Sequence, residues 1–185
     1  MERKVDIRTI RTKNVIKNEI LDFIEKEKEI SIQAITKSCS INRNTFYIHF
    51  KNINEAIDEI KNDIADEVVN SLVDYSIEEL NVNPSLFIDA IYKVILTNPK
   101  YTKVFFDKKY ENHYNGILRH KISDHFLNKC KDTEFDLRMV KTSIEFFVSG
   151  LFYSIYDWYQ EEDNESIEEL TDRISEIVTK RIHYQ

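Results

Sequence analysis

The sequence has only two glycines and two prolines among its 185 residues. A β-sheet protein of this length needs many tight turns, and glycine and proline dominate such turns. Their scarcity therefore argues against a sheet and favours long helices joined by short connections. We predict an all-α fold of about nine helices.

Cysteine and long apolar runs are also scarce. Cys39 and Cys130 lie far apart and form no metal-binding or redox spacing, so we expect a reduced, cytoplasmic protein. The most apolar segment, residues 144–159, contains Glu145 and Asp157 and is too short to span a bilayer. No apolar signal core follows the charged N-terminus. We therefore expect neither a membrane association nor export.

The motifs of the common enzyme classes are missing. There is no glycine-rich phosphate loop, no nucleophile elbow and no His-Glu-x-x-His zinc motif. One group of residues suggests a metal, namely His113, His120, Asp124 and His125. Because nothing completes a ligand set, we interpret these as surface or polar-core residues. Without these motifs and a ligand set, we expect a non-enzyme without metal or cofactor. The alternative, an all-helical enzyme with an unrecognised site, would need converging titratable groups in a pocket.

The net charge of −7 is divided unevenly along the chain. Residues 1–51 carry 11 Lys and Arg against 7 Asp and Glu, a net charge of +4. Residues 52–185 carry 15 against 26, a net charge of −11. A basic end on an acidic body is typical of a DNA-binding head joined to a regulatory domain. An ordinary scatter of charge is the alternative.

Two short amphipathic helices follow each other between about Ile32 and Lys51. Ser31 and Asn42 are suited to cap them, and Phe46 and Phe50, one turn apart, are expected in the core. The second helix is too short to be a core element, yet the segment carries several polar side chains, namely Arg43, Asn44, Thr45, Tyr47, His49 and Lys51. This is the layout of a helix-turn-helix, whose second helix enters the major groove of DNA.

The flanking segments predict three parts. A first helix over about residues 8–28 completes a three-helix head over 1–51, with the start of helix four reaching about 64. Asn52 and Glu55 have capping-box spacing, and an apolar stripe then continues a long connector helix within 52–80. Residues 81–185 are expected to form a further helical domain. Its helices are expected near 84–97, 99–109, 112–131, 135–160 and 166–183, the first two after Asn-Pro pairs.

Residues 10–64 resemble the DNA-binding head of the TetR/AcrR family of bacterial transcriptional regulators. The resemblance rests on Ile32, Ile35, Ile41, Thr45-Phe46-Tyr47, His49-Phe50-Lys51 and Glu55-Ala56-Ile57. The later helices, with Phe147-Val148-x-Gly150-Leu151 and Trp158, are similar to the family's regulatory domain, which implies that residues 81–185 form a helical effector-binding and dimerisation domain. In such proteins the last two helices usually pair with their copies in a dimeric four-helix bundle.

The resemblance implies roles for residues of the head. Ser31 and Gln33 would contact the DNA backbone. Base contacts would come from Arg43, Asn44 and Thr45, whose side chains suit guanine, adenine and a thymine methyl. Phosphate contacts would come from Tyr47, His49 and Lys51. For Tyr47 and His49, packing against helix one or four is the alternative.

Three positions depart from the family pattern. Ser40 stands in the turn where glycine is usual, and a left-handed residue there would cost about 1 kcal/mol. Asn44 replaces a frequent glycine and should alter the operator sequence. Ile53 replaces a common lysine, which removes one phosphate contact and lowers the salt dependence by about one unit of slope.

The body is rich in aromatic residues, most of which we assign to the core and a dimer interface. Some would line an apolar effector pocket, for which we name Tyr101, Phe105, Tyr114, Phe147 and Tyr153. The resemblance places a dimer interface on the last two helices, at Gly150, Trp158, Ile174 and Ile177. A mid-helix glycine such as Gly150 is costly unless a close backbone approach compensates.

These features lead to two functional hypotheses. The first is a homodimeric repressor that binds double-stranded DNA at a palindromic operator and is released by an unidentified small-molecule effector. The alternative is a TetR-like adaptor or co-activator that acts through a protein partner and has no effector of its own.

Overall fold

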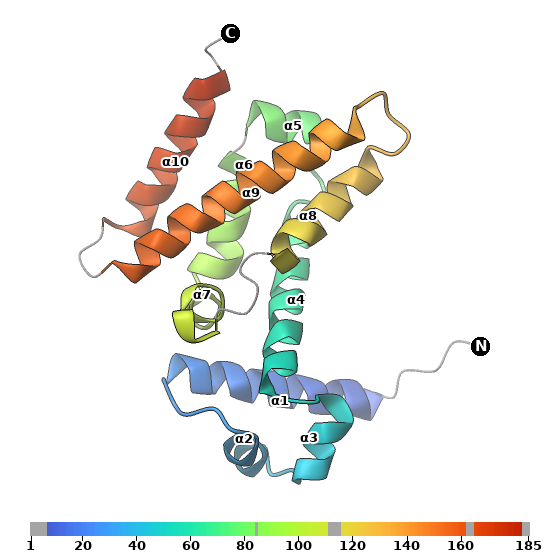
Figure 1. Ribbon diagram of the computed structural model, residues 1–185, viewed down its shortest axis with the longest axis vertical. Coiled ribbons are helices and arrows are strands. Elements are labelled where there is room, and N and C mark those ends of the chain that lie inside the picture. Colours follow the sequence, from blue (N-terminus) through green and yellow to red (C-terminus); the bar gives the residue numbers. More distant parts are fainter. Residues whose placement is uncertain (1–6, 84, 111–115, 162–164, 183–185) are drawn as a thin grey trace.

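The computed structural model describes residues 7–83, 85–110, 116–161 and 165–182. Within these ranges the chain forms ten α-helices and no strand (Figure 1). The all-α prediction is confirmed, with one more helix than expected. The helices are α1 (Ile7–Glu25), α2 (Ile32–Ser38), α3 (Arg43–His49), α4 (Ile53–Ser71), α5 (Ile77–Val82), α6 (Ser85–Ile91), α7 (Pro99–Phe106), α8 (Gly116–Lys129), α9 (Leu137–Gln160) and α10 (Ile167–Ile182).

The first three helices form a compact head. Ser31 caps α2 by accepting a hydrogen bond from the backbone N–H of Ala34 at 3.2 Å. Asn42 caps α3 in the same way, with the N–H of Thr45 at 2.8 Å. Both predicted caps are confirmed. The rings of Phe46 and Phe50 lie 5.7 Å apart in the core and are almost fully buried, as the sequence predicted.

The connector α4 carries the expected apolar stripe but is shorter than predicted. Its N-cap Asn52 accepts a hydrogen bond from the N–H of Glu55 at 2.9 Å. The return bond of a capping box does not form, because the Glu55 carboxylate accepts from the N–H of Lys51 instead. The helix ends at Ser71, before residue 80. A separate helix α5 follows because Ser76 and Glu79 make a complete capping box.

The remaining body helices lie close to their predicted ranges. Asn98 caps α7 and Pro99 occupies its first turn, as predicted. The helix expected over 84–97 is divided into α6 and a π-helical segment, Tyr92–Leu96. The corresponding cap before α6 involves Pro84, which lies outside the described residues. A 3-10 turn, Lys108–Tyr110, follows α7.

Helix α7 lies between the head and the body (Figure 1). Its Phe106 is fully buried, with its ring 5.4 Å from Phe152 and 6.2 Å from Tyr159 of α9. The carbonyl of Phe106 accepts a hydrogen bond from the side chain of Gln160 at 2.6 Å. The other side of α7 packs on α1. Helix α7 therefore contacts both α1 and α9, the second of them through an aromatic cluster.

Ion pairs also connect the head to α4. Lys17 of α1 is buried and lies 2.5 Å from Asp63 of α4, and Lys13 lies 2.6 Å from Glu59. Burial opposes the ionisation of Glu59, but its bonds to the two lysines outweigh this and hold the pKa below its ordinary value. These lysines face α4. The charge of +4 counted for residues 1–51 therefore overstates the cations that the head can offer to a partner.

Candidate functional site

The outer face of α3 is the strongest candidate for a functional surface in the head. Of its side chains, only that of Phe46 is buried. Arg43, Asn44 and Tyr47 are exposed, and Figure 1 shows α2 and α3 together at one end of the molecule. Tyr47 leans edge-on against Phe46 at 5.9 Å but keeps half of its surface exposed. A short helix with one anchor and a polar outer face can present its side chains to a large partner.

The other predicted DNA contacts surround this face. Gln33 on α2 and Lys51 after α3 are exposed, while Thr45 and His49 are half-buried on α3. Ser31 is half-buried at the start of α2, with its hydroxyl oxygen engaged by the cap. All eight predicted positions therefore lie on α2, α3 or their ends.

Ile48 is a surface residue that the sequence reasoning missed. It is 77% exposed although it is a large aliphatic residue on a helix of a well-packed head. It lies one turn after Asn44 and two residues from Phe46, so it points away from the core. The helical period of α3 could have identified it. An aliphatic side chain here is suited to contact a thymine methyl in the major groove.

The turn between α2 and α3 holds Ser40 in the left-handed region, with φ of 55°. The N–H of Ser40 donates to the carbonyl of Lys37, and the N–H of Ile41 donates to that of Thr36. This pattern is a Schellman motif, which favours glycine at the position of Ser40. The backbone at Ser40 therefore has the left-handed conformation that suits the glycine usual at this position in the family, and serine is strained there.

We expect Ser40→Gly to raise the free energy of unfolding by about 1 kcal/mol, because glycine removes the left-handed penalty. Urea denaturation followed by circular dichroism measures the change. Glu27, with φ of 52° in an equivalent motif after α1, serves as the comparison. Glu27→Gly should gain less, because Glu27 also pairs with Lys103 at 2.7 Å. An equal increase in the free energy of unfolding for Ser40→Gly and Glu27→Gly would contradict this explanation.

Cys39 precedes that turn and lies against α1, where its thiol donates to the carbonyl of Val15 at 3.9 Å. Burial, with a contribution from Glu19, raises the pKa of the Cys39 thiol to about 11. We expect its alkylation by a maleimide at about pH 8 to be about 100-fold slower in the folded protein than in denaturant, because only the thiolate reacts. Mass spectrometry of the modified peptide measures both rates, and equal rates would contradict this placement.

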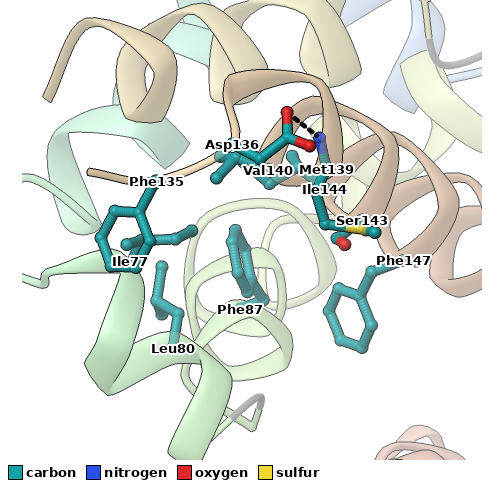
Figure 2. Close-up of a pocket in the computed structure, with 10 residues that line it drawn as sticks. All are labelled: Ile77, Leu80, Phe87, Phe135, Asp136, Met139, Val140, Ser143, Ile144 and Phe147. Carbon is teal, nitrogen blue, oxygen red and sulfur yellow. Dashed lines mark hydrogen bonds between the residues drawn. The ribbon is translucent and has the colours of Figure 1, made fainter. Parts of the chain in front are cut away.

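A cavity of about 500 Å³ lies in the body between α5, α6 and the first half of α9 (Figure 2). Its walls are mainly apolar, with one hydroxyl and one carboxylate. The lining residues are Ile77, Leu80, Phe87, Phe135, Asp136, Met139, Val140, Ser143, Ile144 and Phe147. Figure 2 shows the Phe87 ring between Leu80 and Phe147.

This cavity differs from the effector pocket expected from the sequence. Of the five residues named, Phe147 lines it. Phe105 is buried against Phe152, with ring centroids 6.0 Å apart. Tyr101 faces Glu67 of α4, and Tyr153 is 61% exposed on the outer face of α9. Tyr114 lies outside the described residues. Of the described members of the predicted set, Phe147 lines this cavity, while Tyr101, Phe105 and Tyr153 do not.

The outer faces of α9 and α10 expose apolar side chains. Phe146 is 75% exposed, and Gly150 and Tyr153 follow it at helical spacing. A Cβ added at Gly150 would meet nothing within 4 Å, so the glycine is not required by packing within this chain. On α10, Ile177 is exposed and Ile174 is half-buried.

Trp158, also predicted for the dimer interface, lies in a different environment. It is half-buried against the core of its own chain. Its indole N–H donates to the carbonyl of Glu165 at 2.9 Å, which bridges the end of α9 and the segment before α10. The tryptophan therefore fixes the connection between the last two helices.

The histidines of α8 do not form a metal site in the part of the chain that the structure describes. His120 and Asp124 are exposed, and His113 lies outside that part. His125 is half-buried, and burial together with Lys129 lowers the pKa of its imidazole. Among the described helices, none combines the length and apolar character needed to cross a membrane.

Comparison with known proteins identifies the body. A TetR-type family model, described as a transcriptional regulator C-terminal region, matches residues 82–180. The match covers more than half of the chain and contains α6 to α9 with most of α10. No curated protein matches the sequence. The matched region lies outside the helix-turn-helix, so it is independent of the resemblance carried by the first three helices. The chain therefore belongs to the TetR family of transcriptional regulators.

Proposed function

We propose that the protein is a cytoplasmic, homodimeric repressor that binds a near-palindromic DNA operator and releases it when an effector binds. The observation that carries this proposal is the polar outer face of α3 on a chain whose body belongs to a regulator family. Two copies of α3 would occupy successive major grooves, about 34 Å apart. An effector would release DNA only to the extent that it prefers a conformer with a different spacing of the heads.

Within the head, the residues divide by the part of DNA that they would contact. Arg43 and Asn44 are exposed at the first turn of α3, where recognition helices contact bases, and Ile48 adds an apolar contact. Lys51 and Gln33, both exposed, would contact phosphates. Thr45 would add a base contact, and Ser31, Tyr47 and His49 would contact the DNA backbone.

A selection experiment tests the proposed function. Purified protein is mixed with random double-stranded DNA, and bound fragments are recovered and sequenced over several rounds. We expect a near-palindromic sequence whose half-sites are about one helical turn apart, and a mobility shift whose affinity falls with salt. Recovery of no preferred sequence would contradict the DNA-binding role.

Dimerisation through α9 and α10 is part of the proposal. The exposed stripe of Phe146, Gly150 and Tyr153 provides an apolar face on which two copies of α9 could cross. A close crossing would also explain a glycine that packing within one chain does not need.

We expect Phe146→Asp to convert the dimer to a monomer at micromolar concentration, because each interface would bury two uncompensated charges. Sedimentation velocity measures the oligomeric state. Val82→Asp is the matched control, since Val82 is equally exposed at 78% but belongs to α5 and not to α9 or α10. A dimer that survives Phe146→Asp would place the interface elsewhere.

The packed aromatic residues between α7 and α9 favour one alternative, an adaptor or co-activator that acts through a protein partner. Phe105, Phe106 and Phe152 pack together between α7 and α9, with ring centroids 5.4 to 6.3 Å apart, so these rings leave little room for a small molecule between the two helices. Purified protein that binds DNA alone and releases it on addition of a small molecule would eliminate this alternative.

A further inference from the structure

We propose that the cavity between α5, α6 and α9 binds an apolar molecule that carries one positive charge (Figure 2). The proposal concerns binding, which can be measured without DNA. Its regulatory meaning rests on the proposed function, because the bound molecule would be the effector.

The size and walls of the cavity suit a small apolar molecule. A volume of about 500 Å³ lies within the range of small-molecule pockets, about 300 to 1,000 Å³. Leu80, Phe87 and Ile144 form its floor and are each at least 95% buried. Phe135 and Met139 stand at the mouth and are exposed. A molecule that fills the cavity would remove apolar surface from water on both sides, which favours binding.

The charged groups that line the cavity favour a positively charged ligand over a negatively charged one. Asp136 is the one charged residue among the lining side chains, and neither Lys, Arg nor His is among them. An anion would therefore meet a carboxylate and no compensating cation. A cation would gain a charge-assisted hydrogen bond to the carboxylate. The net charge of −11 over residues 52–185 acts in the same direction.

The carboxylate of Asp136 has one oxygen available for this bond. Its Oδ1 caps α9 and accepts from the N–H groups of Arg138 at 2.9 Å and Met139 at 3.3 Å. The second oxygen makes no hydrogen bond with any residue that the structure describes. Asp136 is exposed, and the hydroxyl of Ser143, also exposed and two turns along the same side of α9, adds a second polar contact at the open edge of the cavity.

The cavity is connected to the head through one continuous path. Phe87 belongs to α6, which leads through the π-helical segment Tyr92–Leu96 into α7. Segments of π-helix are frequent at functional sites. Helix α7 then holds the end of α1, because Lys100 pairs with Asp22 and Lys103 pairs with Glu27. These bonds hold the pKa values of both carboxyls below their ordinary range. A ligand that displaces Phe87 would thereby shift α7 against α1.

Fluorescence of Nile red, a neutral apolar dye, provides the binding measurement. The dye is bound to the purified protein and displaced with octylammonium, octanol or octanoate, which share a chain length but differ in charge. We expect octylammonium to displace the dye at a concentration about tenfold lower than octanol, and octanoate to be weaker than both. Displacement by octanoate at the same concentration as octylammonium would overturn the assigned charge preference.

Two substitutions test the assigned residues. Asp136→Asn keeps an N-cap of similar strength, so the helix should remain while the difference between octylammonium and octanol disappears. Ser143→Trp should fill the cavity and abolish Nile red binding. Lys141→Trp is its control, since Lys141 is exposed two residues earlier, about 200° around α9. Circular dichroism checks that each variant is folded. Unchanged Nile red binding by folded Ser143→Trp would overturn the site.

The outcomes separate the binding site from the proposed function. If octylammonium displaces the dye but does not release DNA in a mobility shift, the site stands and its role as an effector site fails. If the protein selects no DNA, the displacement measurements still decide the site. If Nile red binds a monomeric Phe146→Asp variant but not the wild-type dimer, a second copy covers the cavity and the proposal is overturned.

Discussion

Arg43→Ala is expected to lower the affinity for the selected operator by about 5-fold to 150-fold, or about 1–3 kcal/mol. Arg43 is exposed at the first turn of α3, and a guanidinium there can form two hydrogen bonds to one guanine. Alanine removes both bonds but keeps the helix, because alanine is the best helix former. The affinity should fall most for operators with the preferred base at one position of each half-site. Mobility shifts at fixed salt against a set of single-base variants measure this pattern.

Lys51→Ala is the matched control for Arg43→Ala. Lys51 is equally cationic and exposed, but it follows the end of α3, where a phosphate contact is expected. Its loss should weaken binding to all sequences alike and lower the salt slope by about one unit. Comparison of the two variants therefore distinguishes the loss of a base contact from the loss of a positive charge near the phosphates. If Arg43→Ala also weakens all sequences equally, Arg43 does not contact bases.

The head was largely predictable because its signals are local. Ser31 and Asn42 cap helices through bonds to residues three positions later, and such bonds depend on short-range sequence alone. Phe46 and Phe50 were assigned to the core by a one-turn spacing. The capping box at Ser76 is equally local and could have predicted α5. Ile48 was not identified because only the polar residues and the two phenylalanines of this segment were considered.

The cavity was not predictable because it depends on which helix faces meet. Phe105 and Tyr153 belong to helices in the expected places, yet one fills the core and the other faces solvent. The cavity instead uses residues at helix ends and in a loop, such as Ile77 and Phe135. Periodicity places a side chain on a face of its own helix, whereas the packing of that face is set by tertiary contacts.

The uneven charge of the two segments indicated a basic head, but it did not show which cations are exposed, because this also depends on tertiary contacts. Lys13 and Lys17 count as cations of the head in the sequence, yet they are bonded to Glu59 and Asp63 of α4. Pairing across segments that are 42 to 46 positions apart is invisible to a count along the chain. The cations left for a partner are those on the exposed face, which include Arg43 and Lys51.

Phe106→Ala is expected to lower the free energy of unfolding by about 3–5 kcal/mol, which is the largest stability effect that we predict. Phe106 is fully buried, and its ring contacts Phe105, Phe152 and Tyr159. Alanine would leave a void between α7 and α9 in a cluster whose members are held by separate helices. Chemical denaturation at one fixed protein concentration measures the loss, since the stability of a dimer depends on concentration.

Phe135→Ala is the matched control, because the same substitution is made where the ring is 37% exposed at the mouth of the cavity. Its cost should be clearly smaller than that of Phe106→Ala, since more than a third of Phe135 is already exposed. A loss below about 1 kcal/mol for Phe106→Ala would mean that α7 and α9 collapse to close the void. Such a collapse would also move α7 against α1, so it would appear as altered DNA affinity in a variant of nearly normal stability. The two measurements together therefore distinguish a rigid connection between head and body from one that can be repacked.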